Sequence, residues 1–259
     1  MKKFISILVA MLAVSVFTVA QLKLYVYEKD GSVSQYIAAN VDSIVFSEQD
    51  ADIEYEEVPN LPVTDRGYVD MGLSVKWATC NLGAWWPEDY GNYYAWGETE
   101  PKTNYTLNTY KWCEGDFRSF TKYCAEAEYG TVDNLSKLEA EDDAASVNLG
   151  GNWRMPTIAE FEELFNEENC AWVWTDIQGV YGYLITSKIN GNSIFLPAAG
   201  CIDGRIFYSK GTYGAYWASD SVENQTISTS SYGYDFVDNS IQWFASIRNV
   251  GNTIRPVMP

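Results

Sequence analysis

Short stretches of alternating apolar and polar residues, separated by Gly and Asn turns, fill the sequence from residue 67 onward. This pattern predicts β-strands, because successive side chains of a strand point to opposite faces of a sheet. Asn190 and Gly191 favour a two-residue type I′ turn, so the strands on either side of them form the best-marked hairpin. The expected strands lie near 68–71, 74–79, 93–96, 183–188, 193–196, 214–219, 230–237, 241–246 and 253–257.

One helix start is clearly marked in this β-rich region. Thr157 and Glu160 have the spacing of a capping box, in which each side chain bonds the backbone N–H of the other residue. The apolar residues that follow have helical spacing and predict one buried helix face: Ile158, Phe161, Leu164 and Phe165. A second, weaker helix is predicted near 139–146.

Residues 1–20 have the pattern of a signal peptide. Lys2 and Lys3 precede an apolar run that ends at Phe17, and the small residue Ala20 precedes the proposed cleavage site. An uncleaved anchor helix is the less favoured alternative, because the run is short for a membrane span. We therefore expect an exported protein, in the periplasm, at the cell surface or secreted, with no membrane span in the mature chain.

Two segments precede the main domain of 67–259. Residues 21–47 predict a small β meander, with strands near 22–28, 33–37 and 41–46. Residues 48–66 are rich in acidic residues and predict a solvated linker. A calcium site is the alternative for this segment, but it lacks the spacing and the glycine of an EF-hand.

The composition excludes several classes of function. The chain has 35 acidic and 17 basic residues and a net charge of −18, so nucleic acid is not an expected partner. The absence of histidine excludes Ser-His and Cys-His nucleophiles and His-ligated metals. The five cysteines form no Cys-x-x-Cys pair, which argues against a structural zinc site. Cys113 and Cys124 flank a short polar loop and are the candidate disulfide, since export permits disulfides.

A series of motifs in the main domain resembles a known family. The motifs are GYVDMGLSVKWATCNLG at 67–83, YAWGETEP at 94–101, GGNWRMPT at 150–157, NSIFLPAAG at 192–200, YWAS at 216–219 and IRPV at 254–257. In this order they resemble the Fibrobacter succinogenes major paralogous domain family, which is common in exported proteins of Bacteroidota. The resemblance implies a C-type-lectin-like fold, distantly similar to formylglycine-generating-enzyme-like domains, with the C-terminal strand beside the N-terminal strand. We therefore expect an α+β domain of short, mainly antiparallel strands with one or two helices, after the small β meander.

The sequence favours a protein without enzymatic activity, cofactor or metal. No cysteine follows Cys201, so the paired-cysteine chemistry of the formylglycine-generating enzymes is not expected. The calcium-binding sugar motifs of lectins are also missing from the sequence. Glu141, Asp142 and Asp143 could serve glycoside hydrolysis, but adjacent helical residues point about 100° apart. The favoured alternative is a set of charges at a helix N-terminus.

Several residues are predicted to serve the fold. Trp153 and Arg154 belong to a scaffold in which Arg154 could pair with Asp142 or Asp143, and Arg255 invites a similar interpretation. Thr157 and Glu160 form the predicted helix cap.

The region 205–248 combines aromatic residues with small polar ones, a composition typical of binding surfaces. Trp217 and Phe236 are expected in the core, and the candidate ligand-binding residues are Tyr208, Tyr213, Tyr232 and Trp243. We expect a non-catalytic binding or adhesion module that recognises a glycan or a surface protein through this face. The alternatives are a structural surface domain without a small-molecule site and, less favoured, a carbohydrate-active enzyme.

Overall fold

The structure is a computed structural model that describes residues 23–27, 33–37, 67–221 and 229–259. The chain divides into two compact units, Met1–Val58 and Pro59–Pro259. In the first unit, β1 (Lys23–Tyr27) and β2 (Val33–Ile37) form an antiparallel hairpin, as the alternating pattern predicts. The signal peptide at 1–20, the third strand of the meander and the linker at 48–66 lie outside the described residues.

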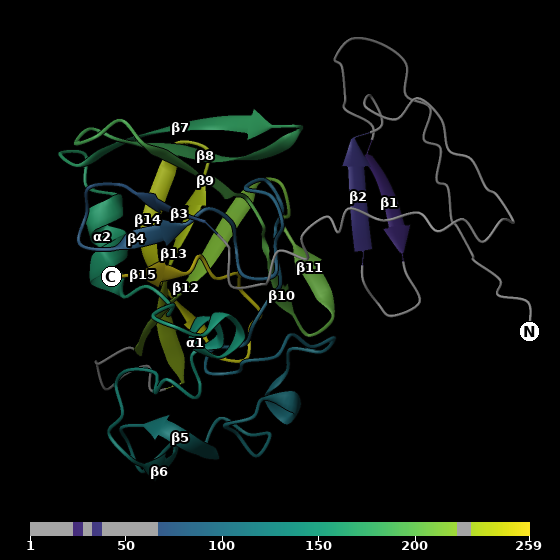
Figure 1. Cartoon of the computed structure of the whole chain (residues 1–259). Helices are drawn as coiled ribbons and strands as arrows, with labels where there is room; N and C mark the ends of the chain where they lie inside the picture. The colour runs from purple at the N-terminus through teal and green to yellow at the C-terminus, as the bar shows by residue number, and fades with distance from the viewer. Residues whose placement is uncertain (1–22, 28–32, 38–66, 222–228) are drawn as a thin grey trace, which may run out of the picture. The chain divides into compact units, whose positions relative to one another are not determined.

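The second unit is built almost entirely of short strands (Figure 1). Its described strands are β3 (Tyr68–Asp70), β4 (Lys76–Ala78), β5 (Phe120–Cys124), β6 (Gly130–Val132), β7 (Cys170–Ile177), β8 (Val180–Ser187), β9 (Ser193–Pro197), β10 (Cys201–Asp203), β11 (Ile206–Tyr208), β12 (Tyr213–Ser221), β13 (Ser230–Val237), β14 (Ser240–Ile247) and β15 (Val257–Met258). Its helices are α1 (Ala144–Leu149) and α2 (Ile158–Leu164), with a 3₁₀ turn at Leu107–Thr109. In the described residues, no helix is long and apolar enough to cross a membrane.

The expected α+β class is wrong. The part of the chain that the structure describes is 42% strand and 9% helical, and it is predominantly β. Both helices are short, and in each case residues at the C-terminal end explain where the helix ends. Helix α1 ends at Gly150, whose φ of +67° is left-handed and favours glycine. Helix α2 ends where the Asn169 side-chain amide donates to the Glu163 carbonyl at 3.0 Å, which satisfies an end carbonyl without another helical turn.

The helix caps follow the sequence closely. The Thr157 hydroxyl accepts from the Glu160 N–H at 3.2 Å, and the Glu160 carboxylate accepts from the Thr157 N–H at 2.8 Å, so the capping box is confirmed. Helix α1 corresponds to the weaker helix predicted near 139–146, but it begins later, at Ala144. Asp143 is its N-cap and accepts from the Ser146 N–H at 2.9 Å.

The strands near the two ends of the second unit pair with each other. In the sheet β15-β4-β3, Val257 pairs with Trp77, and Tyr68 pairs with Ala78. This juxtaposition of the C-terminal strand with the N-terminal strands agrees with what the family resemblance implies.

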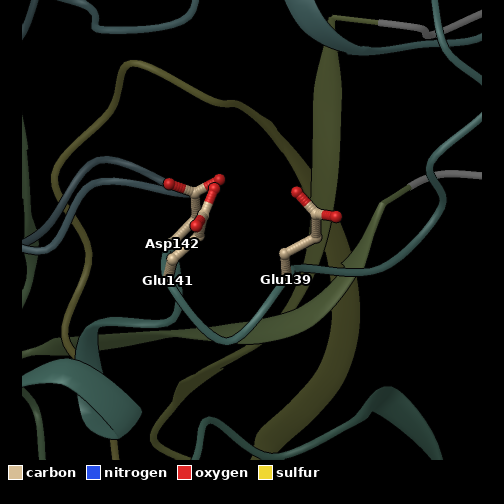
Figure 2. A group of neighbouring side chains, drawn as sticks. All are labelled: Glu139, Glu141 and Asp142. Carbon is tan, nitrogen blue, oxygen red and sulfur yellow. The ribbon is translucent and has the colours of Figure 1, made fainter.

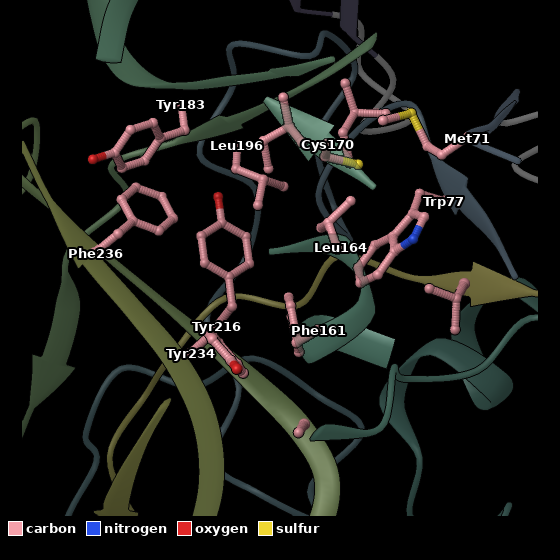
Figure 3. Close-up of a cluster of buried hydrophobic side chains, with 14 of the residues drawn as sticks. Met71, Trp77, Phe161, Leu164, Cys170, Tyr183, Leu196, Tyr216, Tyr234 and Phe236 are labelled. Atoms are coloured by element: carbon pink, nitrogen blue, oxygen red, sulfur yellow. The ribbon is translucent and has the colours of Figure 1, made fainter. Parts of the chain in front are cut away.

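Two three-stranded antiparallel sheets enclose the main core. One has the order β7-β8-β9 and the other β12-β13-β14. In Figure 1, β7 and β8 lie at one end of the second unit, β5 and β6 lie at the other, and β12 to β14 run between them. Figure 3 shows the core between the two sheets, where the Tyr183 and Phe236 rings meet edge to face and Tyr216 lies beside them. The predictions that Trp217 and Phe236 are core residues are confirmed.

The best-marked hairpin is confirmed, but its predicted turn is wrong. Strands β8 and β9 pair as far as Thr186 and Ser193, and the loop between them is longer than two residues. Of the predicted turn pair, only Gly191 has a positive φ. The side-chain amides of Asn190 and Asn192 donate to the Asp70 carbonyl at 2.8 and 2.7 Å, and these long-range bonds define the loop.

The predicted disulfide is not present in the structure. Cys113 and Cys124 are both free thiols, as are the other three cysteines. The sulfur of Cys113 lies 3.1 Å from the Asp116 carbonyl, and the sulfur of Cys124 lies 3.1 Å from the Glu126 carbonyl. Each thiol is therefore directed toward its own loop.

Candidate functional site

The four predicted ligand-binding residues do not share one surface. Tyr234 pairs with Trp243 across β13 and β14, which places Trp243 and Tyr232 on the same face of the sheet. Their rings meet edge to face at 5.8 Å. Tyr213 pairs with Val237, so it lies on the opposite face. Tyr208 belongs to the separate β10–β11 hairpin, where it is exposed beside Ile206 and Phe207.

The half-buried Tyr213 is held by the fold. Its hydroxyl donates to the Asp235 carboxylate at 3.0 Å. Burial raises the pKa of Tyr213, and the negative charge of Asp235 raises it further. Burial also raises the pKa of Asp235. We therefore remove Tyr213 from the candidate ligand-binding residues, whereas Trp243 and Tyr208 remain exposed.

A groove of about 580 Å³ opens at the edge of the main core, between β7 and the β13–β14 hairpin. It combines aromatic and aliphatic side chains with two carboxylates, an amide and two hydroxyls. We call this cavity the groove, and its lining residues are Glu167, Trp172, Val173, Trp174, Tyr183, Asp238, Asn239, Ser240 and Ile241.

Strand β7 places two tryptophans on one side of the groove. Gln178 and Gly179 both have positive φ and form the two-residue turn to β8, which fixes the register of the pair. Trp172 then pairs with Ile185 and Trp174 with Tyr183, on the face of the sheet that covers the core. The two tryptophans remain half-buried, because β7 is the edge strand of its sheet.

The tryptophan rings are oriented by their neighbours. Trp174 meets Tyr183 edge to face at 5.3 Å and Phe236 at 6.3 Å. Trp172 meets Phe165 edge to face at 6.1 Å. Side chains held in this way lose little conformational entropy when a ligand packs against them. The rings are therefore preorganised for contact.

The polar side of the groove is the turn between β13 and β14. Val237 pairs with Ser240, so Asp238 and Asn239 are the two turn residues. Asn239 has a φ of +64°, a left-handed conformation that Asn tolerates better than most residues. The Tyr183 hydroxyl donates to the Val237 carbonyl at 3.1 Å and accepts from the backbone of the turn, so it anchors the turn to the core.

The acidic residues before α1 serve the fold. Figure 2 shows Glu139, Glu141 and Asp142 projecting from one loop, with carboxylate oxygens within 4.8 Å of one another. The Lys122 ammonium lies among them, 2.7 Å from Asp142 and 3.6 Å from Glu141, with an ion pair to Glu139. Burial alone would raise the pKa of Asp142, but hydrogen bonds from Lys122, from the Tyr123 hydroxyl and from Lys111 lower it. The cationic position in this cluster is therefore filled by a lysine.

The arginines also have structural surroundings. Arg154 pairs with Glu160, with Nη1 2.8 Å from Oε2, so the expected pairing with Asp142 or Asp143 is wrong. Asp143 instead accepts from the Ser146 and Met155 N–H groups. The buried Arg255 donates to Asn81 Oδ1 and to three backbone carbonyls, and Trp153 is buried in a second apolar cluster.

Sequence reasoning missed the tryptophans of the groove. Their signal was present, since Trp172 and Trp174 alternate along a β-prone stretch that ends at Gln178 and Gly179. The alternation does not reveal that the strand lies at a sheet edge beside an open cavity. Comparison of the chain with protein-family models, curated proteins and solved structures gave no match. The resemblance to the Fibrobacter succinogenes major paralogous domain family therefore stays a prediction.

Proposed function

We propose that this protein is an exported, non-catalytic carbohydrate-binding module and that the groove is its binding site. The observation that carries the proposal is the pair of half-buried tryptophans opposite a polar turn. The C–H faces of sugar rings pack against indole rings, and sugar hydroxyls bond to carboxylates and amides. Trp172 and Trp174 supply the first kind of contact, and Asp238, Asn239 and Glu167 supply the second.

The size of the groove supports a small-molecule or glycan ligand, and its mixed lining favours a glycan. Its volume of about 580 Å³ falls within the range of about 300–1,000 Å³ typical of ligand pockets. Most such pockets have a mainly apolar lining, whereas four of the nine residues that line the groove are polar or charged. Sugars, which present both apolar faces and hydroxyl edges, fit this combination.

A protein partner is the second candidate. Strand β11 exposes three consecutive apolar side chains, Ile206, Phe207 and Tyr208. Exposed aromatic residues of this kind are enriched in protein interfaces. This candidate predicts a contact on the β10–β11 hairpin, away from the groove tryptophans.

A glycan array of the full chain tests the proposal. Wild type is compared with Trp174→Ala, with Asn239→Gly and with Trp85→Ala as the matched control. Trp85 is 71% exposed and does not line the groove. Asn239→Gly removes the amide but keeps a residue that adopts positive φ, so the turn is retained. Circular dichroism spectra show whether each variant is folded.

The proposal predicts glycan binding that is lost in Trp174→Ala, weakened in Asn239→Gly and unchanged in Trp85→Ala. Binding that survives in Trp174→Ala, or no binding to any glycan, would contradict it. Each bound glycan is also incubated with the protein and analysed for shorter products. Cleavage that Asp238→Asn abolishes would favour the carbohydrate-active enzyme, because Glu167 and Asp238 both line the groove.

A further inference from the structure

Aromatic side chains continue beyond both ends of the groove. We infer that the groove is the middle of a longer track that binds a linear polysaccharide without acidic groups along several consecutive sugar rings. This inference rests on the proposed function and specifies the class of ligand. It depends on three observations, which concern the order of side chains on the two sides of the groove, the rings beyond its ends and the charges along it.

The side chains of β7 and of β14 that face the groove lie opposite each other in matching order along the two strands. Phe236 pairs with Ile241 of β14, and its ring contacts Trp174 of β7. Two residues before Phe236 on β13, Tyr234 pairs with Trp243 of β14. The Tyr234 ring stacks at 5.2 Å on Phe165, and the Phe165 ring contacts Trp172 of β7. The order of Trp174 and Trp172 on β7 therefore matches the order of Ile241 and Trp243 on β14. The axis of the groove runs along these two strands.

Exposed rings lie at both ends of this axis. At one end, Tyr181 stacks on Trp174 with ring centroids 6.3 Å apart, and it is 49% exposed. At the other end, Trp243 lies on the same face as Ile241, about 7 Å further along β14. Trp243 is 58% exposed and contacts Tyr232. We call this row of rings the aromatic track, and it consists of Tyr181, Trp174, Trp172, Trp243 and Tyr232.

The sides of the track are open. Strands β7 and β14 are both edge strands, and among the described strands none pairs with their outer sides. A ligand longer than the groove would then lie on the exposed rings of Tyr181 and Trp243. An open track of this kind suits the interior of a polymer chain, whereas a closed pocket suits a chain end or a single sugar.

Among the described residues, the charged side chains that line the groove are both carboxylates. They belong to Glu167 and Asp238, and Asp176 is exposed opposite Tyr181 on the neighbouring strand. The Lys188 ammonium donates to the backbone carbonyl of Glu167. The whole chain carries a net charge of −18. Like charges repel at short range, so uronate, sulfate and sialate groups are disfavoured in the track. Uncharged sugar polymers meet no such penalty.

The test measures affinity against ligand length and charge by titration calorimetry of the full chain. The neutral probes are di-, tetra- and hexasaccharides of β-1,4-glucan, β-1,4-xylan, β-1,4-mannan and β-1,3-glucan. The acidic probes are oligogalacturonates of the same lengths. We expect at least one neutral series to bind, with affinity rising about tenfold or more from disaccharide to hexasaccharide, since the longer chains contact more rings of the track; this rise corresponds to about 1.4 kcal/mol.

Trp243→Ala, with Trp85→Ala as its control, distinguishes binding along the whole track from binding in the groove alone. We expect Trp243→Ala to weaken hexasaccharide binding by about fivefold or more and to leave disaccharide binding unchanged, since Trp243 lies outside the groove. Trp85→Ala leaves both unchanged. Equal affinity for all lengths, no effect of Trp243→Ala, or tighter binding of oligogalacturonate overturns the inference while the proposed function stands. Failure of every saccharide to bind overturns the proposed function itself.

Discussion

The carboxylate of Asp142 is buried, with 1% of the residue exposed, and it accepts hydrogen bonds from Lys122, Lys111 and Tyr123. We expect Asp142→Asn to lower the free energy of unfolding at pH 7 by about 3 kcal/mol, because two lysines lose their shared anion. Urea denaturation of the variant and the wild type measures this difference. Glu141→Gln is the control, since its side chain is 78% exposed and it should change stability by less than about 0.5 kcal/mol.

The pH dependence of this difference follows from the direction of the pKa shift. The folded-state pKa of Asp142 lies below its unfolded value of about 4. Its contribution to stability is therefore present above pH 4 and is lost as the pH falls through the folded pKa. The difference between wild type and Asp142→Asn should shrink as the pH is lowered from 7 toward 3. A difference that stays constant over this range would contradict the assignment.

At the residue scale, hydrogen bonds between residues close in the sequence could be predicted, whereas the residues of the binding surface could not. Thr157 and Glu160 lie three residues apart, so their bonds depend only on local geometry. Tyr213, Tyr232 and Trp243 were grouped by composition, but their faces depend on a register between strands that the sequence does not state. Trp174 was missed for the same reason, because its place beside an open groove depends on β13 and β14.

At the scale of the element, helix α2 depends on its capping box. Thr157→Ala removes the hydroxyl that accepts from the Glu160 N–H. We expect a loss of about 1 kcal/mol in the free energy of unfolding. Thr103→Ala, at an exposed loop position, is the control and should leave stability within about 0.5 kcal/mol. Equal effects of the two substitutions in thermal or urea denaturation would show that the cap contributes nothing.

The turns show where prediction of an element from its own residues fails. Asn190 and Gly191 have the residue types of a tight turn, but the side-chain amide of Asn190 bonds instead to the Asp70 carbonyl, 120 residues earlier in the chain. Gln178 and Gly179 form the tight turn that the other pair was expected to form. Local preference therefore decides a turn only where no distant group competes for its polar side chains.

At the scale of the whole molecule, the second unit holds every apolar cluster that the structure describes. We expect a fragment of residues 59–259 to fold alone, with a thermal midpoint within about 3 °C of the full chain, since a shift of that size corresponds to about 1 kcal/mol for a unit of this length. Differential scanning calorimetry of both proteins measures this. A fragment that unfolds without a cooperative transition would contradict the division into units.

The class of the fold was mispredicted at this same scale. The strand pattern and the single marked helix start were in the sequence, and the structure has both. The α+β expectation came from the family resemblance, whereas the two helices of the structure have only six and seven residues. Gly150 and Asn169 end these helices locally, and the rest of the unit is short strands.

The central claim is that the groove beside Trp172 and Trp174 binds a glycan. It is tested most directly by NMR of the full chain with ¹⁵N-labelled indoles, with resonances assigned by single Trp→Phe variants, during titration with the neutral hexasaccharides. We predict that the Trp172 and Trp174 indole signals shift with added saccharide, together with that of Trp243, while the exposed Trp85 and the buried Trp96 do not. Shifts confined to Trp85, or spectra that no saccharide changes, would contradict the claim.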